Sequence, residues 1–294
     1  MVNPTAQITE LRNFVLDEIF KAIGVSEKGW MRRLLWPLFW LPAQRFAELG
    51  VRFDHQVAAN GFRQAARWLL PQFIDEYSID GGDNIPEKGP LLIASNHPGT
   101  VDSLLIGAQI PRNDFKFIAG DLPFVRGLSS VGRYMIHTTQ DTHVRMTTLR
   151  SSIRHLEDGG ALLIFPTGGI DPDPAFMPSA VESLDAWSRS LGLFLRTVPH
   201  TKVLIAIVSG ILAPTFYNNP IPKLRKNIRD RQRIAEFMQV IRLLLIPSRL
   251  SLSPKISFSS IMSLDIAERD DVDNALQTII LESKKLYQDH IKRS

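Results

Sequence analysis

The chain has 294 residues, of which 44% are hydrophobic and 22% charged, a balance typical of globular proteins rather than disordered ones. It contains no cysteine, which excludes disulfides and thiolate chemistry and fits a reducing compartment. The formal net charge is only +4, but residues 220–255 alone contain nine Lys or Arg, the last two being Arg249 and Lys255. Such a patch suits lipid head groups, acidic carrier proteins or nucleic acid, or is an ordinary solvated helix face.

The first residues show no basic segment leading into an apolar stretch and a small-residue cleavage site, so we expect no signal peptide. The longest uncharged apolar runs, residues 34–44 and 203–217, are shorter than the roughly 20 residues that a membrane-spanning helix needs. The sequence therefore predicts a cytoplasmic protein without a transmembrane helix.

Residues 1–75 are expected to form an all-α leader, because apolar residues recur near helical spacing in 8–23 and 57–73. The segment GVSEKG and the prolines Pro37 and Pro42 are expected to break these helices. Residues 30–45 combine three tryptophans with arginines. This combination indicates a surface that rests in the lipid interface, or else the aromatic core of the leader.

Residues 76–294 are expected to form an α/β domain, because short apolar runs typical of strands alternate with segments of helical spacing. We expect strands at 91–95, 115–120, 134–139, 161–166, 202–209 and 255–261. We expect helices near 101–111, 143–158, 179–196, 227–246 and 271–291. This alternation predicts a central, mostly parallel sheet flanked by helices, with ligands bound beyond the carboxyl ends of the strands.

The stretch ASNHPGTVDSLL places His97 and Asp102 five positions apart, between an expected strand and an expected helix. On an uninterrupted helix their side chains would point about 140° apart, so a contact requires His97 to lie in the turn. There the imidazole can take a proton from a hydroxyl on one nitrogen while its other N–H donates to Asp102. The alternative is a purely structural pair, which is common at strand ends.

Three further blocks follow in order, and together the four resemble the phospholipid and glycerol acyltransferase family of the acylglycerolphosphate acyltransferase type. The first block, GGDNIPEKGPLLIASNHPGTVD, carries Asn-His, four residues and Asp. The third is the strand and loop GGALLIFPTGGID, and the fourth is the apolar strand VLIAIVSGI. The second, residues 116–141, fits the family at Lys116, Asp121, Leu122, Pro123, Gly127 and Gly132.

The resemblance covers residues 78 to about 215 and implies an O-acyltransferase. It implies transfer of a fatty acyl group from acyl carrier protein or coenzyme A to a hydroxyl of glycerol phosphate or a lysophospholipid. His97 is then the general base and Asp102 its orienting partner. The implied partners are a thioester donor and a membrane lipid surface on the inner face of the membrane, with no nucleic acid. Backbone amides near the His97 turn are expected to stabilise the oxyanion.

The chain departs from the family pattern at Gly99, where serine is usual, and at Thr167, Gly169 and Ile170, where residues tied to acceptor and phosphate binding are usual. Backbone N–H groups around Gly168 and Gly169 are candidates to cradle an anion, a plain glycine turn being the alternative. We expect the following residues to bind substrate: Lys116, Arg126, Arg133, Arg145, Thr167, Gly168 and Gly169.

The motif DPDP at 171–174 is expected to be an exposed turn, and we expect no metal and no bound cofactor. Two alternatives to the enzyme stay open. One is a catalytically degraded relative that binds lipids at a membrane surface. The other is a metal-dependent ester hydrolase that uses His97, Asp102 and Asp171.

Overall fold

The computed structural model describes residues 4–26, 29–121, 123–246, 250, 252–264 and 271–292. Leu122 of the second block and Arg249 of the basic patch lie outside the described residues. The chain begins with α1 (Pro4–Ala22) and the long helix α2 (Trp30–Leu69), which the 3₁₀ turn η1 (Leu70–Gln72) follows. The all-helical character expected of the leader is therefore observed.

Helix α2 runs through both of its prolines, so the expectation that Pro37 and Pro42 end a helix is wrong. Each proline removes one backbone hydrogen bond, but α1 packs along α2 and Pro42 is buried, so tertiary contacts hold the segment helical. The real kink is at Gly61, whose φ of 77° and ψ of 167° are accessible to glycine and strained for other residues.

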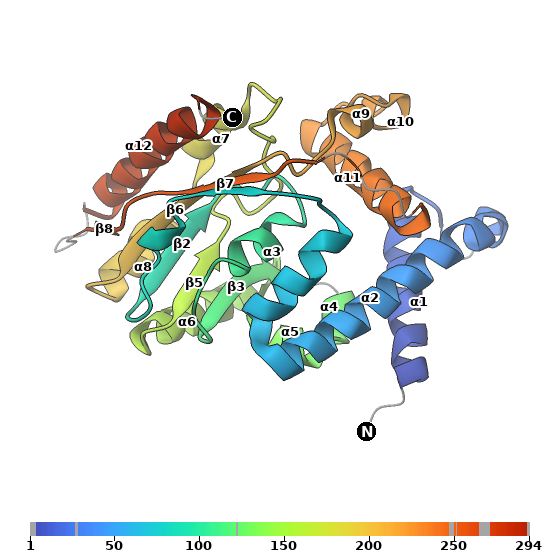
Figure 1. Ribbon diagram of the computed structural model, residues 1–294, viewed down its shortest axis with the longest axis horizontal. Helices are drawn as coiled ribbons and strands as arrows, with labels where there is room; N and C mark the ends of the chain where they lie inside the picture. The colour runs from blue at the N-terminus through green and yellow to red at the C-terminus, as the bar shows by residue number, and fades with distance from the viewer. Residues whose placement is uncertain are drawn as a thin grey trace.

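A mostly parallel sheet forms the centre of the protein, as expected (Figure 1). Its strand order is β1-β7-β6-β2-β5-β3-β4, with β8 beside β6. The strands β2, β3, β4, β5 and β6 are parallel to their neighbours within this group. Strands β7 and β8 run antiparallel to β6, and β1 is parallel to β7. The strands are β1 (Ser78–Asp80), β2 (Leu91–Ser95), β3 (Phe115–Gly120), β4 (Met135–Thr138), β5 (Ala161–Ile164), β6 (Lys202–Ser209), β7 (Lys255–Phe258) and β8 (Met262–Ser263).

Short and long helices connect the strands and cover both faces of the sheet. They are α3 (Asp102–Gly107), α4 (Pro123–Arg126), α5 (Ser129–Gly132), α6 (Thr142–Glu157), α7 (Ala180–Ser183), α8 (Ser190–Thr197), α9 (Pro214–Tyr217), α10 (Pro220–Lys223), α11 (Ile228–Leu245) and α12 (Asp271–Lys292), with the 3₁₀ turns η2 (Gly82–Asn84) and η3 (Leu184–Ala186). The single helix expected over 179–196 is divided into α7, η3 and α8, because the backbone at Trp187 is extended.

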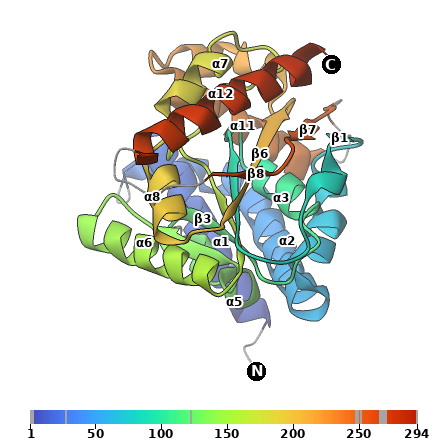
Figure 2. The ribbon, with the colours of Figure 1, turned by 90° about the vertical axis from the view of Figure 1, so that its left-hand side faces the viewer.

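Alternate residues of the buried strands pack into two separate cores. Ile93 and Leu163 face the first core, together with the leader and α3, whereas Leu92 and Leu162 face the second, under α6, α8 and α12. Figure 2 shows α6 and α8 on one side of the sheet and α2 and α3 on the other. The period-2 pattern of the strands thus fixes which helices each face receives.

The leader shares the first core with the sheet, and α1 and the start of α2 also form a small hydrophobic cluster of their own. The buried carboxylate of Asp54 on α2 accepts the backbone N–H groups of Ser130 and Val131 on α5, both at 2.8 Å. We propose that residue 75 marks a change of pattern between two parts that fold together. Among the helices of the described residues, none combines the length and the apolar character that crossing a bilayer requires.

Candidate active site

The His97 turn joins the carboxyl end of β2 to α3, and its geometry is the one expected from the sequence. Nδ1 of His97 lies 2.8 Å from Oδ2 of Asp102, and the same oxygen accepts the Gly99 N–H at 3.1 Å. The His97 side chain is 26% exposed while the Asp102 side chain is fully buried. Because a carboxylate only accepts, Nδ1 carries the proton in this pair, and Nε2 is the nitrogen that Asp102 does not engage.

The aromatic ring of Phe165 fixes the plane of the imidazole. The two rings stack with centroids 4.3 Å apart and planes 23° apart. Phe165 directly follows β5, the neighbour of β2 in the sheet, so two adjacent strand ends supply the imidazole and the ring on which it stacks. The His97 ring is therefore held on one side by Asp102 and on one face by Phe165.

The loop after β5 binds the His97 turn through Asp171. His97 N–H donates to Oδ2 of Asp171 at 3.0 Å, and the Asp171 N–H donates back to the His97 carbonyl at 2.7 Å. Asp173 accepts the N–H groups of Gly210, Ile211 and Leu212, which follow β6. Both aspartates are fully buried, so the expectation of an exposed DPDP turn is wrong: their carboxylates satisfy backbone N–H groups inside the protein.

Helix α11 covers the His97 turn with a stripe of buried polar side chains. Gln232 donates to the carbonyls of Pro98 at 2.8 Å and Asp171 at 2.7 Å, and so ties the turn to the loop after β5. Glu236 accepts a short hydrogen bond from the Thr100 N–H. Sequence reasoning missed both residues, since α11 is rich in polar residues on all sides and gives no signal for which of them face inward.

Side chains of α11 also explain two of the departures from the family pattern. A Cβ atom at Gly99 would lie 2.8 Å from Oε1 of Glu236, so a larger residue there would require the Glu236 side chain to move. A Cβ atom at Gly169 would lie 3.2 Å from Nη1 of Arg229. The cation of Arg229 therefore rests directly over the glycine loop that follows β5, and this loop borders the His97 turn.

Three carboxylates set the protonation of His97. Burial lowers its pKa, but the negative charges of Asp102, Glu236 and Asp171 outweigh burial and raise the pKa to about 9. Burial raises the pKa of Asp171 to about 6, and burial also raises the pKa of Glu236. The imidazolium and the buried carboxylates stabilise one another.

The backbone amides of the His97 turn are already occupied. The N–H groups of His97, Gly99 and Thr100 each donate to a carboxylate, and Pro98 has no N–H. The expectation that these amides stabilise an oxyanion is therefore not supported. Within the described part of the chain, the amides of Thr167 and Gly169 have no acceptor, and Gly168 between them has a φ of +67°. Successive amides around such a residue form a concave site for anions.

The remaining substrate-binding candidates are spread along the sheet. Lys116 pairs with Leu162, the second residue of β5, and so lies toward the amino edge, away from His97. Arg133 precedes β4 at the same edge. Arg126 forms a short ion pair with Asp121, and Arg145 is exposed near the start of α6. Only the loop containing Thr167, Gly168 and Gly169 lies next to His97; no contact of the described residues links the four cations to it.

Neither end of the sheet offers a metal site in the part of the chain that the structure describes, where no group of three His, Asp or Glu side chains is arranged to hold an ion. The Asp171 carboxylate, which a metal-dependent hydrolase would need as a ligand, instead accepts the His97 N–H.

The Glu236→Gln variant tests the electrostatics of the site. Removing the carboxylate charge destabilises the imidazolium, so the pKa of His97 should fall from about 9 toward the ordinary value. The glutamine still accepts the Thr100 N–H. The pKa is measured by NMR titration of the His97 ring protons, with the exposed Glu10→Gln as the matched control. An unchanged titration midpoint in Glu236→Gln would contradict this account.

Two comparisons with known proteins gave matches. Residues 77–197 match the family model described as "Acyltransferase". Among solved structures, the chain is similar to the crystal structure of the 1-acyl-sn-glycerophosphate (LPA) acyltransferase PlsC from Thermotoga maritima. The TM-score is 0.43 and the identity 16%, over 82% of this chain and 81% of that chain. No curated protein matches the sequence. The family match covers the first three of the four blocks; it supports the resemblance seen in them and the class of enzyme that this resemblance implies, an O-acyltransferase.

Proposed function

We propose that the protein transfers a fatty acyl group from an acyl thioester of coenzyme A or acyl carrier protein to a hydroxyl of a glycerol-phosphate or lysophospholipid acceptor. One observation carries the proposal: in a chain with an acyltransferase-family segment, His97 donates through Nδ1 to the buried Asp102 and keeps Nε2 for a substrate. This is the arrangement by which a carboxylate orients a histidine base.

The chemical step follows from this geometry. Nε2 of His97 in its neutral form takes the proton of the acceptor hydroxyl while the hydroxyl oxygen attacks the thioester carbonyl. Because the pKa of His97 is about 9, this neutral form is the minor one at neutral pH. The tetrahedral intermediate then expels the thiolate by breaking the C–S bond, and the imidazolium returns its proton to the sulfur. No nucleophile of the protein is needed, in keeping with a chain that has no cysteine. The carboxylates around His97 stabilise the imidazolium formed in the first half of the reaction.

The phosphate of the acceptor is proposed to bind between Arg229 and the loop containing Thr167, Gly168 and Gly169. The guanidinium lies over Gly169, and the amides of Thr167 and Gly169 have no acceptor among the described residues. A guanidinium fork and free amides suit phosphate oxygens. Since Asp171 in this loop also contacts the His97 backbone, an acceptor anchored there is close to the base.

Helix α2 supplies the surface that we propose to rest on the membrane. Trp30, Leu34 and Leu38 are spaced four residues apart, and they are 74%, 68% and 60% exposed. Trp36 and Phe39 on the same helix pack instead against a small core with α1, so the aromatic residues serve both purposes. Leu224, between α10 and α11, is 82% exposed within the basic 220–255 segment. Exposed apolar residues flanked by cations are typical of a helix that binds at an anionic lipid interface.

Replacing His97 by Ala tests the general base. We expect kcat/KM to fall about 10³-fold or more, because loss of a positioned base removes the step that activates the hydroxyl. Thiol release from an acyl thioester measures the rate, and no cysteine of the protein adds a background signal. The exposed His143→Ala on α6 is the control, and circular dichroism verifies the fold.

A fully active His97→Ala would reject the proposal. A wild-type protein that binds lipid vesicles but consumes no thioester with any of a panel of acceptors would favour a lipid-binding relative without catalysis.

The Arg229→Ala variant tests the acceptor site. With a lysophosphatidate acceptor we expect KM to rise about 10-fold or more, since a charge-assisted phosphate contact contributes roughly 1.5–3 kcal/mol. With a monoacylglycerol, which has no phosphate, KM should stay as in the wild type. Arg233→Ala, one turn further along α11 and exposed, is the matched control. Equal losses with both acceptors would place the phosphate elsewhere.

The double variant Leu34→Glu/Leu38→Glu tests the membrane surface. We expect its partition onto vesicles containing anionic lipid to weaken at least about 10-fold, because two carboxylates would enter the apolar part of the interface. Flotation with vesicles measures the bound fraction. Leu281→Glu on α12, where the leucine is 54% exposed, is the control for an apolar surface residue elsewhere. Unchanged flotation of the double variant would exclude this face.

A further inference from the structure

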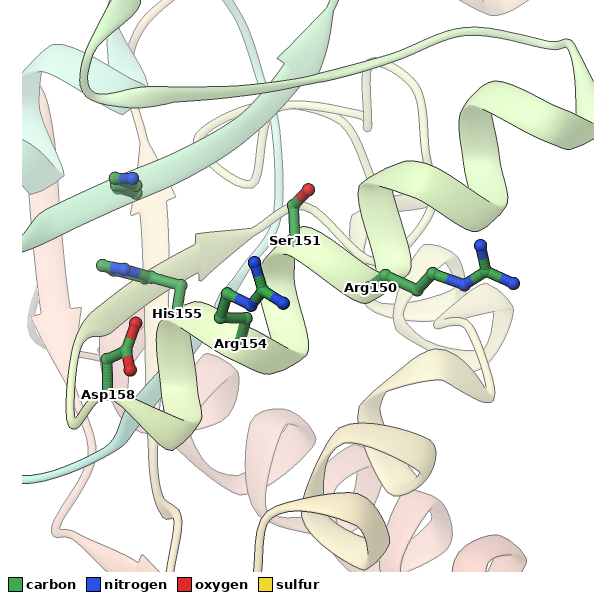
Figure 3. Close-up of a pocket in the computed structure, with 6 residues that line it drawn as sticks. Arg150, Ser151, Arg154, His155 and Asp158 are labelled. Carbon is green, nitrogen blue, oxygen red and sulfur yellow. The ribbon is translucent and has the colours of Figure 1, made fainter.

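A hollow of about 350 Å³ lies between α6 and β3 (Figure 3). The α6 residues that line the hollow recur about one helical turn apart and so share one face of the helix. Leu149, Ile153 and Leu156, on another face of α6, pack into the core. The residues that line it are Lys116, Arg150, Ser151, Arg154, His155 and Asp158.

The hollow carries an excess of positive charge. Lys116, Arg150 and Arg154 are cations, and Asp158 is the one carboxylate among the lining residues. In the described part of the chain none of these four side chains forms an ion pair. Arg150 and Arg154 are four residues apart on one helix, a spacing at which like charges destabilise the helix. An anion in the hollow would remove this repulsion.

Neighbouring side chains do not supply that anion. The carboxylate of Asp114 already accepts Nε–H and Nη2–H of Arg112, at 2.8 and 2.7 Å. The Nε2 atom of His155 lies 3.1 Å from the Ala161 carbonyl, and burial together with the charge of Lys116 lowers the pKa of His155. His155 is therefore neutral, and Lys116, Arg150 and Arg154, which line the hollow, have no ion-pair partner among the described residues; in Figure 3 the Arg150 side chain extends away from His155.

The hollow and the His97 site lie toward opposite ends of the parallel strands. Lys116 is the second residue of β3, and Asp158 precedes β5, so both mark the amino edge of the sheet. His97 follows the carboxyl end of β2, which is parallel to β5. The hollow is thus separate from the site proposed for acyl transfer.

We propose that this hollow binds a small phosphate-bearing anion. Two guanidinium forks match phosphate oxygens in pairs, Lys116 adds a third cation, and the Ser151 hydroxyl adds a neutral donor. The volume lies at the lower end of the range for small-molecule sites, which suits a phosphate with a modest organic group rather than a bare ion. A soluble phosphorylated metabolite and the phosphate of a lipid head group share this chemistry.

The test measures binding of inorganic pyrophosphate to the full chain by calorimetry. We expect millimolar or tighter binding by the wild type, at least 10-fold weaker binding by Arg150→Gln/Arg154→Gln, and unchanged binding by His97→Ala. The control Arg196→Gln/Lys202→Gln removes the same charge from exposed positions outside the hollow and should bind as the wild type does. In phosphate-free buffer the Arg150→Gln/Arg154→Gln melting temperature should equal or exceed the wild-type value.

A parallel measurement with phosphatidylcholine vesicles, with and without phosphatidic acid, identifies the source of the phosphate. Tighter binding of the wild type than of Arg150→Gln/Arg154→Gln to phosphatidic acid vesicles, without pyrophosphate binding, would assign the hollow to a lipid head group. The proposal would be overturned if the wild type and Arg150→Gln/Arg154→Gln bound both pyrophosphate and phosphatidic acid vesicles equally. It would also be overturned if Arg196→Gln/Lys202→Gln weakened binding as much as Arg150→Gln/Arg154→Gln. Since none of these readouts requires acyl transfer, an inactive enzyme and an empty hollow give different results.

Discussion

Buried carboxylates that accept backbone N–H groups hold the carboxyl edge of the sheet together. Asp102 accepts the Gly99 N–H, Asp171 that of His97, and Asp173 those of three residues after β6. Each unpaired N–H in this buried region would cost free energy, so the loops after β2, β5 and β6 are stable only in one relative arrangement. The same negative charges raise the pKa of His97. The same buried carboxylates therefore support the loops and raise the pKa of His97.

Helix α11 completes this arrangement from outside the segment that matches the family model. Gln232 joins the His97 turn to the loop after β5, and Glu236 occupies the space that a side chain at position 99 would need. Arg229 brings a cation to the loop at Gly169. Each of the two glycines that depart from the family pattern, Gly99 and Gly169, therefore lies against an α11 side chain.

Three surfaces of the protein differ in chemistry: one is apolar and two carry cations. The apolar face of α2 with Leu34 and Leu38 suits a lipid interface. The loop at Gly169 with Arg229 suits a phosphate next to the base. The hollow beside Arg150 lies toward the other end of the strands. A protein with a net charge of only +4 therefore presents its cations in local groups.

The sequence by itself determined the strand, turn and helix around His97, because apolar runs, Pro98 and the five-residue spacing to Asp102 are local signals. It also determined the mostly parallel sheet, through alternating strand and helix patterns. Only the tertiary structure decided that Pro42 stays within a helix, that Asp171 is buried, and that Glu236 meets Thr100. These depend on contacts between segments as much as 136 residues apart, whose free energy outweighs local preference and leaves no periodic trace in the sequence.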